Sequence, residues 1–188
     1  MWSSPQIWDQ SATDHRFAPA NVVSPDFMDA TCAMNMLIWA WMNGKFVLDP
    51  TVVVANWFFI AAKDREQASD VLKREFEHKE HPFQTFDIFL QRAEVLALRG
   101  AGVKVYYATQ GVGCSIFIPV GSPHQVANTC SAFKIAVDYL PVASLGMTAL
   151  VQEERIQYQG RAIEGDLARV PAHAIAYWQT LLNRQTVW

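Results

Sequence analysis

The stretch that decides the fold is GVGCSIFIPVGSPHQVAN, residues 111–128. Apolar residues before Pro119 predict a strand that ends there, because proline donates no ladder hydrogen bond. Gly121 supplies a tight turn after this strand, and Gly113 allows an equally tight entry into it. The turn leads to His124, which we expect to begin the returning strand with its ring directed inward. A lone histidine is more often structural than a ligand, but the turn and the strand context here favour a metal ligand.

The composition indicates a folded chain with a substantial core. Of 188 residues, 51% are hydrophobic and 18% charged, which fits a single domain over 1–188. A net charge of -3 gives no electrostatic reason to expect direct nucleic-acid binding. The longest apolar run is too short to cross a bilayer, so no membrane contact is expected. Three cysteines without a CxxC spacing are typical of a reduced, intracellular protein.

The order of the predicted elements is strands, a helical insert, strands and then helices. Residues 1–20 are proline-dotted and predicted to be irregular, and 141–188 are predicted to be helical, over about 142–158 and 166–184. Asp64 and Gln67 fit a capping box at the start of a helix. This order predicts a mainly β fold with added helices, an α+β class. The other expected strands are 33–41, 51–60, 103–109, 114–119 and 132–140, and the other expected helix is 87–98. An Asn-Gly turn is expected at Asn43 and Gly44, after the first of these strands.

The histidine turn resembles a known family motif. The spacing G-x5-P-x-G-x2-H-x3-N, from Gly113 to Asn128, resembles the second motif of the cupin, or double-stranded β-helix, fold. The longer stretch FIPVGSPHQVANTCSAFKIAVDYLP, residues 117–141, resembles the C-terminal half of JmjC domains. It is most similar to the histone-lysine demethylases that act on the lysine-nine mark. The stretch 57–76 and the Asp29-Ala30 pair resemble earlier parts of the same branch.

The resemblance implies an Fe(II)- and 2-oxoglutarate-dependent oxygenase. In this family two histidines and a carboxylate hold the iron, and here His124 and Asp26 match two of these three ligands. Ser24 stands where the first histidine is expected, and a serine hydroxyl is a poor ligand for Fe(II). His15 is the only upstream histidine, and its spacing to Asp26 is wrong for the same strand. We therefore expect a weakened metal site.

Two further residues are candidates for binding the co-substrate. Lys134 follows His124 on the next strand and would hold the far carboxylate of 2-oxoglutarate, although a solvent-facing lysine at a strand edge is an equally good interpretation. Asn128 either hydrogen-bonds within the turn, which is the commoner role, or lies near the metal and co-substrate.

The departures from the family pattern leave three interpretations open. About two dozen residues precede Ser24, so the barrel is expected to be incomplete at its N-terminus and to expose apolar surface. The chain is then an oxygenase with an impaired metal site, an inactive pseudo-enzyme that binds proteins, or a fragment without independent activity. A histone or another protein is the expected partner. Nuclear localisation is implied by the resemblance alone.

Overall fold

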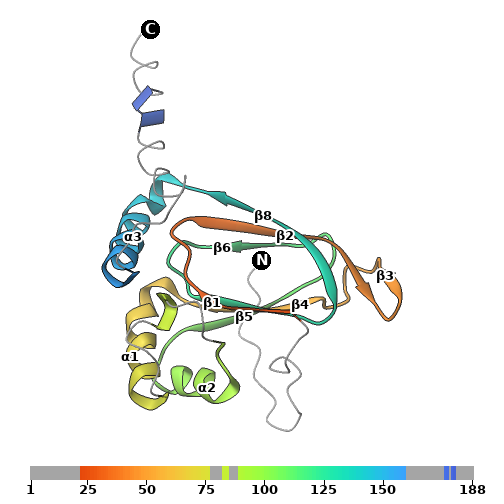
Figure 1. The fold of residues 1–188 in the computed structure, drawn as a ribbon, viewed down its shortest axis with the longest axis horizontal. Coiled ribbons are helices and arrows are strands. Elements are labelled where there is room, and N and C mark those ends of the chain that lie inside the picture. Colours follow the sequence, from red (N-terminus) through yellow and green to blue (C-terminus); the bar gives the residue numbers. More distant parts are fainter. Residues whose placement is uncertain (1–21, 77–81, 85–88, 160–175, 178, 181–188) are drawn as a thin grey trace.

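The structure is a computed structural model, and it describes residues 22–76, 82–84, 89–159, 176–177 and 179–180. Its core is two antiparallel sheets that face each other (Figure 1). This confirms the expected mainly β class with added helices, in the arrangement of a double-stranded β-helix. The expected irregular segment 1–20 and most of the expected helix 166–184 lie outside the described residues.

The first sheet has the order β1-β7-β4-β5. Its strands are β1 (Val22–Phe27), β7 (His124–Asn128), β4 (Ala55–Ile60) and β5 (Val105–Gln110). The expected strand over 51–60 is therefore confirmed only from Ala55, because residues 51 and 52 form a turn in which Asp49 Oδ1 accepts a hydrogen bond from Thr51 N at 2.8 Å.

The second sheet is built around β2 (Cys32–Met42). One edge of β2 pairs with β6 (Ser115–Ile118) and β3 (Lys45–Val47), and the other with β8 (Ser131–Tyr139). The β2–β3 hairpin turns at Asn43 and Gly44, whose φ angles of 51° and 76° suit the Asn-Gly turn expected there. We call this second sheet the β2 sheet.

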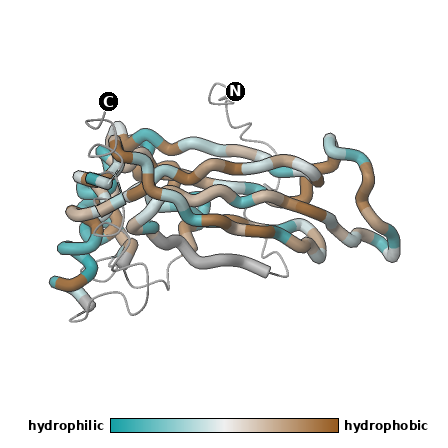
Figure 2. Tube along the Cα trace, turned by 90° about the horizontal axis from the view of Figure 1, so that it is seen from above, coloured by the Kyte–Doolittle hydropathy of each residue, from teal (hydrophilic) through white to brown (hydrophobic). Residues whose placement is uncertain are grey.

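Three helices gather at one end of the strands, whereas β3 protrudes at the other end (Figure 2). They are α1 (Arg65–Phe76), α2 (Arg92–Gly100) and α3 (Leu145–Gln159). Phe58 and Ile60 of β4 form one apolar cluster with buried residues of α1 and α2, so these helices cover the outer side of the first sheet. No helix among the described residues is long and apolar enough to cross a membrane.

The capping box expected at Asp64 and Gln67 is wrong. A short 3-10 turn, η2 (Ala62–Asp64), precedes α1. Asp64 Oδ2 instead accepts a hydrogen bond from Lys104 N at 3.0 Å, and Gln67 Nε2 donates to Ala101 O at 2.7 Å. Both side chains thus tie α1 to the loop before β5. The capping box of this region lies at Gln91 and Glu94, at the start of α2.

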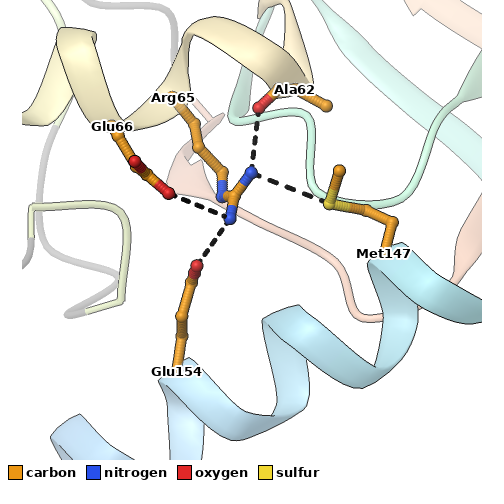
Figure 3. A network of polar contacts seen from close by, with 5 residues as sticks. All are labelled: Ala62, Arg65, Glu66, Met147 and Glu154. Atoms are coloured by element: carbon orange, nitrogen blue, oxygen red, sulfur yellow. Dashed lines mark hydrogen bonds and ion pairs between the residues drawn. The ribbon is translucent and has the colours of Figure 1, made fainter.

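A polar network fastens α3 to α1 (Figure 3). The buried guanidinium of Arg65 pairs with Glu154 Oε1 at 2.6 Å and with Glu66 Oε1 at 3.6 Å. It also donates to the carbonyl of Ala62 at 3.2 Å and to Met147 Sδ at 3.7 Å. These contacts hold α3 beside the turn that carries the candidate site, because Met147 also touches that turn at Gly121.

Candidate metal and co-substrate site

The turn before β7 places His124 as the sequence predicts. The strand β6 ends at Ile118, and Gly121 takes a φ of 70° that favours glycine. A Cβ at Gly121 would come within 3.0 Å of the Met147 side chain. The Gly121 N–H donates to the carbonyl of Asp29 at 3.0 Å, which draws the chain after β1 toward this turn.

His124 is held in one orientation inside the barrel. Its side chain is buried, and its Nδ1 lies 3.0 Å from the carbonyl of Ser122. Since a carbonyl only accepts, Nδ1 carries the proton and Nε2 keeps its lone pair. Burial lowers the pKa of His124 to about 4, although the Ser122 hydrogen bond opposes this shift. The ring is therefore neutral at pH 7, the form in which imidazole binds metals.

Among the side chains that the structure describes, Asp29 is a carboxylate that approaches His124. Its Oδ2 lies 3.9 Å from His124 Nε2. This separation is too long for a hydrogen bond, but two donors about 2.0–2.2 Å from one shared ion would lie about 3–4 Å apart. Burial and, to a lesser extent, the charge of Asp138 raise the pKa of Asp29 to about 6, while Arg155 opposes this shift. Asp29 is thus largely ionised at pH 7 while His124 is neutral.

Ser24 and Asp26 are placed by their backbone on β1, beside β7. Ser24 lies opposite Val126 and Phe27 lies opposite His124, and the register shifts between these two pairs. Asp26 falls within that shift. The strand carrying the two residues therefore runs along the strand that begins with His124, as an H-x-D pattern requires. Their assignment as metal ligand and missing ligand stays a prediction.

Lys134 is directed into the barrel. It lies opposite Leu37, which is fully buried, and its Nζ sits 5.0 Å from the centre of the Trp57 ring. Nζ is itself buried and makes no hydrogen bond to any described residue. Burial lowers the pKa of Lys134 to about 8. The interpretation of Lys134 as a solvent-facing edge lysine is therefore wrong, whereas its role toward a co-substrate stays a prediction.

Trp57 connects the two ends of the site. Its ring lies 6.2 Å from the His124 ring and also packs against Lys134 Nζ. Its Nε1–H donates to Gln110 Oε1 at 2.9 Å. The Gln110 amide in turn donates to the carbonyls of Asn35 and Cys114, at 2.9 and 3.1 Å. This network joins the two sheets, and it fixes the indole between a metal-type ligand and an ammonium group.

Asn35 and Asn128 each carry a buried side-chain oxygen that no described donor uses. Oδ1 of Asn128 and Oδ1 of Asn35 are buried and accept no hydrogen bond from the described residues. The Asn128 oxygen therefore does not close the turn, which was the commoner of its two predicted roles. A buried acceptor without a donor is costly, so both oxygens suit a site that holds a polar ligand.

The residues fit 2-oxoglutarate better than they fit iron. A buried ammonium that has no hydrogen-bond partner among the described residues matches the far carboxylate of a dicarboxylate. For iron, one neutral imidazole and one nearby carboxylate are in place, but the described residues contain no group of three histidine, cysteine or acidic side chains that could hold a metal. That Ser24 takes the place of a first histidine ligand stays a prediction.

Sequence reasoning gave no site role to Asp29, Trp57, Gln110 or Asn35. Asp29 carried a signal, since it was part of the Asp29-Ala30 resemblance. Trp57 could have been found from the alternation of β4, in which Ala55, Trp57 and Phe59 share the barrel side. Gln110 and Asn35 carried no signal, because a glutamine at a strand end and an asparagine within a strand are ordinary in sequence.

Comparisons with known proteins agree with this geometry. A family described as JmjC domain, hydroxylase matches residues 52–139, just under half of the chain. Lysine-specific demethylase 3A of Homo sapiens is 35% identical over 94 residues, and lysine-specific demethylase 3A-A of Xenopus laevis is 33% identical over 94 residues. Each alignment covers 46% of this chain. An E3 ubiquitin-protein ligase, JMJ24 of Arabidopsis thaliana, is 31% identical over 108 residues, 53% of this chain.

The chain matches only a small part of these relatives. The aligned region is 7% of the length of the two demethylases and 11% of the ligase. The matched segment 52–139 includes Trp57, His124 and Lys134, and it begins after Ser24 and Asp26. Residues 52–139 thus match the JmjC domain family, and the two facing antiparallel sheets with an inward histidine at the turn before β7 agree with that match.

Proposed function

We propose that this chain is a JmjC-type oxygenase domain that keeps the 2-oxoglutarate end of its site and has a weakened iron centre. The observation that carries the proposal is Lys134 Nζ, which is buried over Trp57 without a hydrogen-bond partner among the described residues. An ammonium in this state is stabilised by an anion that enters the barrel. The far carboxylate of 2-oxoglutarate supplies that anion.

The iron end would be held by His124 together with a carboxylate. Asp26 is the family-based candidate, and Asp29 is the carboxylate that lies 3.9 Å from Nε2. When bound, iron and 2-oxoglutarate would supply oxidative hydroxylation of an N-methyl group, which then leaves as formaldehyde. The protein's own contribution is a neutral imidazole, an ionised carboxylate and the buried apolar side chains of Trp57 and Phe59. With Ser24 in place of an imidazole, iron affinity and turnover are expected to be low.

A binding role without turnover is the second candidate, and one observation favours it. A relative of comparable identity bears the name of a ubiquitin ligase rather than a demethylase. A JmjC domain can thus lie within a protein named for other chemistry. In this second role the barrel would hold a co-substrate or peptide for recognition alone. A histone or another protein is the proposed partner, and the nucleus the proposed location, on the strength of the demethylase relatives.

The test is an anaerobic titration with Fe(II) in the presence of 2-oxoglutarate. The native chain should bind iron weakly, and Ser24→His should tighten binding by at least about tenfold, since ligand-shell changes alter metal affinity by about 10–100-fold. His124→Ala should abolish binding in both backgrounds. Asp26→Asn and Asp29→Asn identify which carboxylate holds the ion, because only the true ligand should matter.

A second titration isolates the co-substrate end. Without iron, 2-oxoglutarate should bind the native chain, and Lys134→Met should lose that binding. Lys63→Met removes an exposed lysine and serves as the matched control. If the native chain binds iron as tightly as Ser24→His does, the weakened-centre proposal is wrong. If Lys134→Met and Lys63→Met bind 2-oxoglutarate equally, Lys134 is not its anchor.

A further inference from the structure

The outward face of the β2 sheet carries large apolar side chains that no described element covers. Eight of them, from four strands, are 41–60% exposed. We call this set the outer apolar face: Trp39, Trp41, Phe46, Phe117, Phe133, Ile135, Val137 and Tyr139. We infer that this face binds the same face of a second copy of the chain, so that two barrels pack sheet against sheet.

Strand register makes the outer apolar face one continuous surface. Trp39 lies opposite Phe133 across β2 and β8, and their rings stack at 6.0 Å. Trp41 lies opposite Phe46 across β2 and β3, with ring centres 4.6 Å apart. Trp39 also meets Phe46 at 5.8 Å. Four aromatic rings are therefore already held in place, which reduces the entropy lost when a partner covers them.

The size of the face matches that of a stable dimer interface. Large apolar side chains present about 150–250 Å² each when fully exposed, so eight that are about half exposed offer roughly 800 Å². A standard protein interface buries about 800 Å² on each partner. Isolated monomers rarely leave a contiguous apolar patch at or above a few hundred Å² uncovered.

The chemistry of the face favours a second copy over a charged partner. The outward positions of β2, β6 and β8 hold only apolar, serine or tyrosine residues, and the charged residues Lys134 and Asp138 take the alternate positions of β8. A two-fold dimer sets a surface against itself, which demands that no like charges meet. This face meets that demand. A basic peptide would find no carboxylate on it.

Sedimentation velocity of the full chain over a range of concentrations tests the inference. The native chain should be a dimer that dissociates on dilution. Ile135→Glu, at the centre of β8, and Phe46→Glu, on β3, should each raise the dimer dissociation constant at least tenfold, because each places a charge inside the apolar contact. Ile156→Glu is the matched control: Ile156 lies on α3 and is 49% exposed, against 46% for Ile135. It should leave the dimer unchanged.

The other occupants of the face give different results. If the native chain is monomeric at every concentration, the face is covered by residues 1–21 or 160–188 of the same chain, or serves another partner, and the inference is wrong. If Ile135→Glu dissociates the dimer and Phe46→Glu does not, the copies join through the free edge of β8 rather than through the face.

A second measurement protects the test against variants that do not fold. The native dimer should show less acrylamide quenching of tryptophan fluorescence as concentration rises, because Trp39 and Trp41 become covered. Quenching that does not change with concentration, in a chain that sediments as a dimer, would place the contact elsewhere and overturn the inference. Far-UV circular dichroism of each glutamate variant shows whether it keeps its sheets.

Discussion

The outer faces of the two sheets both carry large apolar side chains, but these side chains are buried on the first sheet and exposed on the β2 sheet. On the first sheet, Phe58 of β4 is 4% exposed, because α1 and α2 pack over it. On the β2 sheet, Phe133 of β8 is 48% exposed, because no described element lies over it. Both are phenylalanines in strands that alternate between the barrel and the outside. The difference teaches that the packing of other elements over a strand decides whether its outward apolar residues belong to the core or to an interface. The sequence pattern of the strand does not decide this.

The largest expected effect comes from removing a covered ring. Phe58→Ala should lower the free energy of unfolding by about 3–5 kcal/mol, since it opens a cavity between β4, Tyr107 and the helices. Phe133→Ala should cost about 1 kcal/mol or less in dilute protein, because its ring is half in water. Urea unfolding followed by circular dichroism measures both. Equal losses would contradict the comparison of the two faces.

The second effect concerns the attachment of α3. Glu154→Gln should cost about 1.5–3 kcal/mol, because it replaces a charge-assisted bond of 2.6 Å to the buried Arg65. Glu75→Gln is the control. Its partner Arg74 is 66% exposed at the side chain, so the change should stay within about 0.5 kcal/mol. Thermal unfolding measures the loss of stability in both variants. Equal losses in Glu154→Gln and Glu75→Gln would show that the network in Figure 3 does not hold α3.

The third expected effect is a gain in stability, and it depends on pH. Burial lowers the pKa of Lys134 from its ordinary 10.5 to about 8 in the folded chain. Between these values the unfolded chain binds more protons than the folded one, so stability should rise as pH rises from about 8 to 10.5. Lys134→Met should be more stable than the native chain at pH 7 and lose this part of the pH dependence.

Urea unfolding at several pH values measures this change, with Lys63→Met as the exposed control. If the free energy of unfolding rises with pH equally in Lys134→Met and in the native chain, another group causes that pH dependence. The same variant should lose 2-oxoglutarate binding. A gain in stability together with a loss of binding is expected of a residue that serves the ligand rather than the fold.

The smallest effect is expected on the uncovered face. Val137→Thr adds a hydroxyl to a side chain that is 49% exposed, so the free energy of unfolding should change by no more than about 0.5 kcal/mol in dilute protein. A much larger loss at low concentration would mean that residues of the same chain already cover the outer apolar face. A loss that grows with protein concentration would instead support the dimer.

Sequence patterns predicted the elements whose signals are local. The turn from Pro119 to His124 and the hairpin at Asn43 and Gly44 are confirmed, because proline fixes its backbone angle and glycine and asparagine tolerate positive φ wherever they stand. The capping box at Asp64 was wrong for the opposite reason. Its side chain found a partner in Lys104, 40 positions along the chain, and no local rule reports such a partner.

The candidate site divides in the same way. His124 and Lys134 were named from the motif and the following strand, and Ser24 was recognised as a departure from it. Asp29, in the loop between β1 and β2, approaches His124 of β7, and the bridge from Trp57 through Gln110 to Asn35 joins the two sheets. Such contacts follow from how the two sheets close on each other.

The sequence by itself therefore determined the fold class and the position of His124 at the start of β7. These depend on residue type and short spacing, which the chain carries wherever it folds. Tertiary structure alone decided that Lys134 faces inward, that Asp29 lies beside His124, and that helices cover the first sheet while no described element covers the β2 sheet. Each of these depends on which segments pack together, and packing joins residues that are far apart along the chain.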